Sequence, residues 1–275
     1  MDAKPATEQI VSWMRAHLDQ EISMEEMAEK AGVSPFHFLR TFRRWTGVTP
    51  ALFLSALRLE EAKRLLLTTD RSVTDICFDV GYNSLGTFTT RFTQLVGLSP
   101  ARLRRLGSGF RLEALTLEVE RLSAGTAITG GIGTTAILGT LAAGEPPPGL
   151  IFVGLFHHAL PQQRPLACTL LTAPGPFRLN APKPGRYHLF AACFAHTSEP
   201  LDFLLSSRSV RQVAASGPVY VRTGDSSAGP VELRLRSLGP LDPPLLVALP
   251  LLVAERHART TLREPEEVIR RVSAG

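Results

Sequence analysis

Hydrophobic positions change their spacing near residues 106–109 of this 275-residue chain. Before that point they recur every three or four residues, which is the spacing of amphipathic helices. After it, glycine and proline become frequent, and apolar residues come in short runs or alternate with polar ones, as in strands and turns. The pattern predicts a multidomain α plus β protein, in which an all-α domain is followed by an antiparallel β-sandwich.

The first half is predicted to be a series of short helices. Ile10, Met14 and Leu18 fall on one face of the first helix. The later helices are expected to start at N-cap residues, at first-turn prolines, or at both: Ser23 with Glu26, Ser34 with Pro35, Pro50, Ser72 with Asp75, Asn83 or Ser84, and Ser99 with Pro100. The helix that begins at Pro50 is expected to continue to about Thr68 and is the longest.

One pattern occurs twice in this half. The two copies are Ala28 … Gly32-Val33-Ser34 … Phe42 … Gly47-Val48-Thr49-Pro50 and Cys77 … Gly81-Tyr82-Asn83 … Phe92 … Gly97-Leu98-Ser99-Pro100. In each copy, a small residue lies four positions before a glycine that permits a sharp turn, and a polar cap starts the next helix. The offset is 49 residues at the first glycine (81 − 32) and 50 at the phenylalanine (92 − 42). The second copy therefore carries one extra residue at the turn or at the helix start.

Each copy has the features of a helix-turn-helix unit, whose second helix can enter the major groove of DNA. A spacer helix over residues 50–68 would be roughly 28 Å long at about 1.5 Å per residue. Successive major-groove faces on one side of DNA are about 34 Å apart. The spacer could thus present both recognition helices to adjacent turns of a duplex.

Residues 8–106 resemble the DNA-binding domain of the AraC/XylS family. Besides the paired turns, the resemblance rests on the runs Arg58-Leu59-Glu60-Glu61-Ala62-Lys63-Arg64-Leu65-Leu66 and Val73-Thr74-Asp75-Ile76 … Val80-Gly81-Tyr82 … Phe88 … Arg91-Phe92 … Gly97-Leu98-Ser99-Pro100. It implies a tandem helix-turn-helix domain in a transcription regulator that binds double-stranded DNA sequence-specifically.

In the first recognition helix, the family's base-facing positions fall on Phe36, Leu39 and Arg40. Arg40 could contact a guanine in bidentate fashion and Phe36 could pack on thymine methyls; the alternative for Arg40 is a solvated surface side chain. The remaining predicted DNA-binding residues of this copy, which would position the protein on the backbone, are Ser34, His37, Arg43 and Arg44. Phe38, Phe42 and Trp45 are predicted to be core residues.

In the second recognition helix, the matching positions are Leu85, Gly86, Thr89 and Thr90. Leucine and glycine side chains form no hydrogen bonds with bases, which departs from the commoner family pattern of polar or basic side chains. We therefore expect this copy to contribute mostly backbone contacts, through Asn83, Ser84, Thr87, Thr90 and Arg91, and little base specificity.

Charge and composition exclude few of the possible functions of this chain. The net charge is +5, but residues 1–109 hold 14 Lys/Arg and 12 Asp/Glu, a net of +2 (14 − 12), so the DNA-binding hypothesis rests on local pattern. No run of 18 apolar residues and no N-terminal signal peptide appear. The three unclustered cysteines, Cys77, Cys168 and Cys193, fit a reducing compartment. The expectation is a cytoplasmic protein with no membrane association.

After a linker at residues 107–112, we expect a β-sandwich over residues 113–255 and a tail at residues 256–275, for which a helix is one option. Seven strands, and an eighth as an option at the end, are separated by Gly/Pro turns: Leu115–Leu122, Leu150–Phe156, Ala167–Thr172, Phe177–Leu179, Arg186–Phe194, Val219–Arg222, Val231–Arg236 and, as the option, Leu245–Leu249. The runs Gly175–Leu179 and Pro184–Leu189 resemble transthyretin-like, carboxypeptidase-regulatory sandwiches. A GyrI-like effector domain is the alternative, although its pattern is not visible.

No catalytic, metal or cofactor site is expected in the second half. His188 and His196 would be about 26 Å apart on one strand at roughly 3.3 Å per residue, and neighbours His157 and His158 would point to opposite faces. Three roles stay open for this domain: sensing a small-molecule effector, forming a homodimer, or serving as a passive interaction module. For the whole chain, the alternatives to a regulator are a carbohydrate- or peptide-handling enzyme and a non-specific architectural DNA binder.

Overall fold

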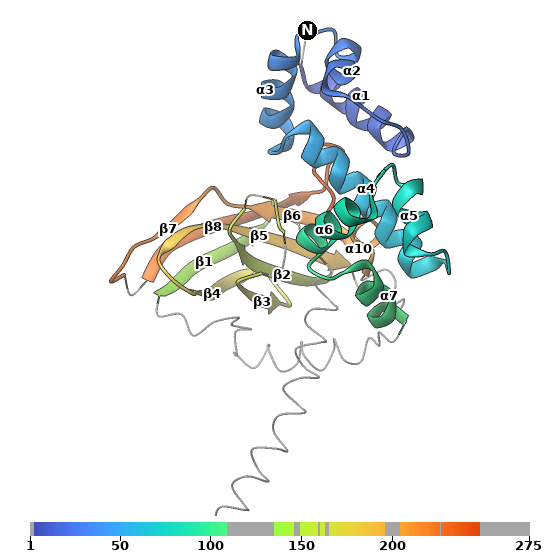
Figure 1. Ribbon diagram of the computed structural model, residues 1–275. Helices are drawn as coiled ribbons and strands as arrows, with labels where there is room; N and C mark the ends of the chain where they lie inside the picture. Colours follow the sequence, from blue (N-terminus) through green and yellow to red (C-terminus); the bar gives the residue numbers. More distant parts are fainter. Residues whose placement is uncertain are drawn as a thin grey trace, which may run out of the picture.

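The computed structural model describes residues 3–108, 135–145, 149–158, 160–162, 165–195, 204–225 and 227–247. An N-terminal helical domain packs against one face of a strongly curved β-sheet (Figure 1). None of the helices in the described part of the chain is long and apolar enough to span a membrane.

Seven helices form the N-terminal domain: α1 (Ala3–Ala16), α2 (Met24–Lys30), α3 (Pro35–Thr46), α4 (Pro50–Thr68), α5 (Val73–Asp79), α6 (Leu85–Val96) and α7 (Pro100–Ser108). Four of the predicted caps form, because the hydroxyl oxygens of Ser23, Ser34, Ser72 and Ser84 each accept a hydrogen bond from the backbone N–H three residues later. Thr49 caps α4 in the same way, just before the predicted first-turn Pro50. The first helix begins at residue 3, before the predicted start of the domain at 8. The predicted linker at 107–112 begins inside α7, and residues 109–112 lie outside the described residues.

The two copies of the repeat have the same turn. Val33 N–H donates to the Ala28 carbonyl and Tyr82 N–H donates to the Cys77 carbonyl, each at 3.1 Å. Gly32 and Gly81 both have positive φ, +67° and +82°. Ser84 is the N-cap of α6, so the extra residue of the second copy is in the turn, between Gly81 and this serine.

The spacer helix α4 is the centre of the helical core, since ten of its 19 residues are buried. Ile10 and Met14 of α1 are also buried, while Leu18 packs against the cluster from a partly buried position. Trp45, which was predicted to be a core residue, is not fully buried: 40% of it is exposed, and Lys4 Nζ lies 5.9 Å from its ring centroid.

The C-terminal domain is one mixed sheet whose strand order is β3-β2-β5-β6-β8-β1-β4, with β7 paired to β5 outside this path. The strands are β1 (Thr135–Ala143), β2 (Gly149–Phe156), β3 (Ala167–Leu171), β4 (Gly175–Ala181), β5 (Gly185–Ala195), β6 (Val210–Ala215), β7 (Val219–Val221) and β8 (Ser227–Ser237), with the short helix α10 (Ser206–Ser209) before β6. The end strands β3 and β4 are in contact, so the sheet is nearly closed and barrel-shaped.

The predicted antiparallel β-sandwich is therefore corrected to a mixed, nearly closed sheet. Its parallel pair is β1 with β8, from Ala136 beside Ser227 to Ala143 beside Leu235. The runs that suggested a transthyretin-like sandwich form β4 and the beginning of β5, and these strands pair with different neighbours. Prediction missed β1 and β6. It also placed a strand at 245–249, whereas the described residues 245–247 have no regular structure, and the predicted strand at 115–122 lies outside the described residues.

Strands β2, β3 and β5 contain long apolar runs because this part of the sheet is buried on both faces. In β2, Ile151 and Val153 belong to a cluster enclosed by the sheet, whereas Phe152 and Phe156 belong to the cluster that includes the helical core. The three cysteines are buried and free.

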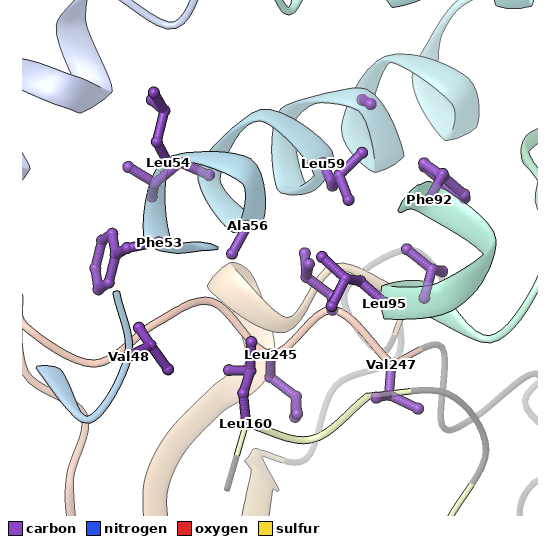
Figure 2. Close-up of a cluster of buried hydrophobic side chains, with 14 of the residues drawn as sticks. Val48, Phe53, Leu54, Ala56, Leu59, Phe92, Leu95, Leu160, Leu245 and Val247 are labelled. Atoms are coloured by element: carbon purple, nitrogen blue, oxygen red, sulfur yellow. The ribbon is translucent and has the colours of Figure 1, made fainter. Parts of the chain in front are cut away.

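The hydrophobic cluster that includes the helical core also contains residues of the sheet domain, and a segment after the last strand helps to join the two domains. Figure 2 shows Leu160 and Leu245 close to Val48, Phe53 and Ala56 of the helical domain, and Val247 below α6. The buried Lys63 of α4 donates a hydrogen bond from Nζ to the Leu246 carbonyl oxygen at 3.0 Å. Residues 241–247, which we call the strap, thus lie against the spacer helix.

Candidate nucleic-acid interface

The exposed face of α3 begins with a cluster of three side chains. Phe36 is 74% exposed, an unusual position for a large apolar ring. The Arg40 guanidinium carbon lies 5.9 Å from the centroid of that ring, and Arg40 Nη2 is 3.5 Å from His37 Nδ1. Phe36, His37 and Arg40, which we call the first-module cluster, therefore form one continuous surface made of an apolar ring and a cation.

Packing of the opposite face determines which side chains α3 exposes. Phe38 and Phe42 are buried, and their ring centroids are 5.5 Å apart. Phe42 also meets Phe53 of α4 edge-on, with an interplanar angle of 88°. With these rings fixed in the core, helical periodicity turns residues 36, 37 and 40 outward.

The backbone-contact candidates of the first module are also accessible. Ser34, Arg43 and Arg44 are exposed, and Leu39 is half-buried. Among the described residues, no ion pair involves the three arginines of α3. Their charges are thus available to a negatively charged partner.

The second module is anchored in the same way but presents a different surface. Phe88 and Phe92 are buried, with ring centroids 5.6 Å apart. Because α6 follows α3 with an offset of 50 residues (85 − 35), Gly86 occupies the place of Phe36 and Thr90 that of Arg40. The surface is hollowed where these short residues lie, in a depression lined by Gly86, Thr87, Thr90, Arg91 and Gln94.

The remaining predicted residues of the second module lie around this depression. Thr89 is half-buried, while the exposed members are Asn83, Ser84, Leu85, Gly86, Thr87, Thr90 and Arg91. Leu85, with 40% of its side chain exposed, is the largest apolar group at this helix start. This face offers hydroxyl groups and one arginine where the first module offers a ring and three arginines.

Contacts with α4 hold the second module in a definite position relative to the first. Arg58 donates from Nε to the Leu18 carbonyl at 2.9 Å and from Nη2 to the Gln20 carbonyl at 2.6 Å, and its guanidinium carbon is 5.8 Å from the Tyr82 ring centroid. The Tyr82 hydroxyl is 2.8 Å from Ser55 Oγ. A Cβ atom at Gly81 would overlap the Leu18 carbonyl oxygen, so the second turn packs directly on the loop between α1 and α2.

Burial perturbs the ionisable groups at this junction. It lowers the pKa of Arg58, an effect that the nearby Tyr82, Asp19 and Glu21 oppose. It raises the pKa of Tyr82, which the hydrogen bond with Ser55 and the nearby arginines oppose. Sequence reasoning did not identify Arg58 and Tyr82 as positioning residues, although both belong to the runs on which the family resemblance rests.

The histidines of the second domain form no metal site in the part of the chain that is described, where no group of three or more His, Cys, Asp or Glu side chains could hold an ion. The His157 ring stacks on Tyr187 with centroids 5.4 Å apart. Burial, reinforced by Arg186 and His158, lowers the pKa of His188. His196 lies outside the described residues.

Comparison with known proteins gives matches to about a third of the chain. A family model described as a helix-turn-helix domain matches residues 27–106. The transcriptional activator RhaS of Klebsiella pneumoniae (strain 342) is 36% identical over 97 residues, which are 35% of this chain and 35% of RhaS. The TetD protein of transposon Tn10 from Escherichia coli is 32% identical over 96 residues, 35% of this chain and 70% of TetD.

Among solved structures, the DNA-binding domain of the global transcriptional factor AdpA in complex with a target DNA is 32% identical. The match covers 39% of this chain and 96% of that domain, with a TM-score of 0.37. The chain spans only about a third of the length of the RhaS relatives. The family-model match ends at residue 106, before the first described strand.

Proposed function

Since the chain belongs, through its helical domain, to the AraC-type DNA-binding transcription regulators, we propose that it binds double-stranded DNA sequence-specifically with two unequal modules. The first module would read bases and the second would mainly hold the DNA backbone. The observation that carries this division is the first-module cluster on α3, whose equivalent positions on α6 are Gly86, Thr87 and Thr90.

In the first module, Arg40 is the base-reading arginine. Its guanidinium can donate two parallel hydrogen bonds to guanine O6 and N7, which is worth about 1–3 kcal/mol of discrimination. Phe36 and Leu39 would contact thymine methyl groups, and the contact with Phe36 limits the freedom of Arg40 before DNA arrives. His37, Arg43 and Arg44 would contact phosphates, as would Ser34 at the helix N-terminus.

In the second module, the backbone contacts would come from Arg91 and from the hydroxyl, amide and main-chain groups around the start of α6. Besides Arg91, these residues are Asn83, Ser84, Thr87 and Thr90, while Leu85, Gly86 and Thr89 would complete the DNA-facing surface with little base specificity. The depression at Gly86 leaves room for a sugar-phosphate strand to approach the helix backbone closely. The 19-residue α4, which Arg58 and Tyr82 connect to the neighbouring turns, would set the distance between the recognition helices α3 and α6 and so match them to two adjacent major grooves.

We further propose the domain division expected from the sequence, with DNA binding in residues 8–106, a linker at 107–112, an effector or dimerisation domain at 113–255 and a C-terminal tail at 256–275, in a cytoplasmic protein. The β-domain would sense a small molecule or form a homodimer. An enzyme is not supported, because the matched RhaS relatives are named as transcriptional activators.

The test is a selection of preferred sequences from random duplexes with the full chain at moderate salt, followed by base-specific and backbone protection on the selected site. We expect a clear sequence preference and base protection concentrated in one of two adjacent major grooves. Equal binding to all duplexes would indicate an architectural DNA binder instead. Strong base-specific protection in both grooves would contradict the unequal roles of the modules.

A further inference from the structure

A cavity of about 470 Å³ lies between the two domains. This volume is within the range of small-molecule sites. The helical domain contributes Arg15, Glu60 and the segment from Trp45 to Val48, which comprises the end of α3 and the beginning of its connection to α4. The sheet domain contributes strand β6 and the segment from Leu238 to Leu245, which includes the first part of the strap.

Most of the wall is apolar and already packed in place. Val48, Leu160 and Leu245 are buried and lie close together beneath α4 (Figure 2). Val213 and Ala214 of β6 are buried as well. A ligand would therefore meet a preformed apolar surface, which lowers the ordering cost of binding.

The charged groups of the wall are paired with one another. Arg236 holds Asp242 with two hydrogen bonds of 2.7 and 2.6 Å, and the Gly239 N–H donates to the same carboxylate at 2.7 Å. Arg15 and Glu60 form a second, looser pair with 3.8 Å between nitrogen and oxygen. Two arginines and two carboxylates leave the lining with no net charge. A charged ligand would lose its hydration without finding an uncompensated counter-ion, which is unfavourable.

We propose that this cavity binds an uncharged, largely apolar small molecule, and that binding there couples the sheet domain to the first DNA-binding module. The coupling part rests on the proposed function. The ligand would touch the turn at the end of α3, where the Thr46 hydroxyl donates to the Phe42 carbonyl at 2.9 Å and is 3.0 Å from the Val48 carbonyl oxygen. Because the walls come from both domains, the ligand favours the arrangement in which the domains are docked.

The binding test compares two fluorescent probes of the same skeleton with the full chain. N-phenyl-naphthylamine is uncharged, whereas anilinonaphthalene sulfonate carries an added anionic group. We expect saturable binding of one uncharged probe per chain and at least about tenfold weaker binding of the sulfonate. Equal affinities, or binding of neither probe, would overturn the proposed ligand class.

Variants locate the bound probe. Ala215 is exposed at the end of β6, pairs with Phe190 of β5, and both residues line the cavity. Ala215→Trp is expected to weaken probe binding at least about tenfold by filling the cavity. The control is Thr140→Trp, at an exposed position of β1 away from the cavity, which should leave probe affinity unchanged. Ala215→Leu repeats the test with a smaller side chain if the tryptophan variant does not fold. Unchanged probe affinity in the folded Ala215 variant would place the probe elsewhere.

The coupling test measures the affinity of the full chain for its selected DNA with and without saturating uncharged probe. We expect a change of about threefold or more, and the same factor must appear when probe affinity is measured with and without DNA. No change in either titration would overturn the coupling. A third outcome separates the two proposals: the chain shows no DNA sequence preference, yet it binds the probe and Ala215→Trp abolishes that binding. This result would refute the proposed function and support the cavity as a binding site.

Discussion

Replacing Lys63 by methionine tests how tightly the strap covers the spacer helix. Lys63 is only 2% exposed, and its Nζ donates a hydrogen bond to the Leu246 carbonyl. Burial lowers the pKa of its ammonium group from 10.5 to about 8, against the opposing effect of Glu60. A charged lysine in this position is a cost to folding at neutral pH, and methionine has a similar length without the charge.

The magnitude follows from the two pKa values. A pKa of about 8 in the folded chain instead of 10.5 corresponds to roughly 3 kcal/mol of destabilisation at neutral pH. Between these values the unfolded chain binds more protons at Lys63 than the folded chain, so the contribution of Lys63 to the free energy of unfolding rises with pH from about 8 to about 10.5. Methionine removes this dependence but leaves the Leu246 carbonyl without its donor, at a cost of about 1–3 kcal/mol.

The assay is denaturant unfolding of both chains at about pH 7 and at about pH 10. We expect Lys63→Met to be equal to or roughly 2 kcal/mol more stable than the original chain near neutral pH, and to lose that advantage at the higher pH. Groups that titrate in both chains cancel in the comparison. Lys183→Met, at an exposed position, is the matched control and should show no such change. A stability difference that is the same at both pH values would refute the burial of a charged Lys63 under the strap.

Two further pairs of variants test the helical domain. Arg40→Ala should reduce the preference for the selected site over random DNA by about 1–3 kcal/mol. Arg91→Ala should instead weaken binding to all duplexes alike and reduce the slope of log affinity against log salt concentration by about one. DNA titrations over a range of salt concentrations measure both effects, and identical behaviour of the two variants would contradict the division between the modules. Gly81→Ala should destabilise the domain by at least about 3 kcal/mol in thermal or denaturant unfolding, because the left-handed φ and the Leu18 carbonyl both oppose a Cβ atom. Gly32→Ala, where φ is also positive but no atom lies within 4 Å, should cost only about 1–2 kcal/mol, and equal losses would show that the close approach to Leu18 does not matter.

Sequence reasoning succeeded in the helical domain because its signals act over a few residues. The predicted caps Ser23, Ser34, Ser72 and Ser84 each accept a hydrogen bond from a backbone N–H only three residues away. The repeat also aligned the two recognition helices, so that the contrast between Phe36 and Gly86 was visible before the fold was known. Exposure of Trp45 was not predictable in this way, because the cavity beside it is completed by residues of the sheet domain.

The sheet domain shows where local pattern stops being informative. Six of the strands were expected close to their observed positions, but the expected sandwich was antiparallel throughout. The parallel pairing of β1 with β8 joins Ala136 to Ser227, 91 residues apart (227 − 136). No spacing of apolar residues distinguishes that partner from an antiparallel one, because the alternation of buried and exposed residues in β1 and β8 sets which face each strand buries and not the direction of its neighbour.

Amino-acid order alone thus determined the helices, their caps, the repeated turn and the side chains that α3 and α6 present outward, since each depends on hydrogen bonds and periodicity within a short stretch. Tertiary structure alone decided the pairing of the strands, the interdomain cavity and the environment of Lys63. In sequence, Lys63 is an ordinary charged position in a helix. It is buried only because Leu246, 183 residues later, passes over it, and such a contact depends on how the whole chain packs.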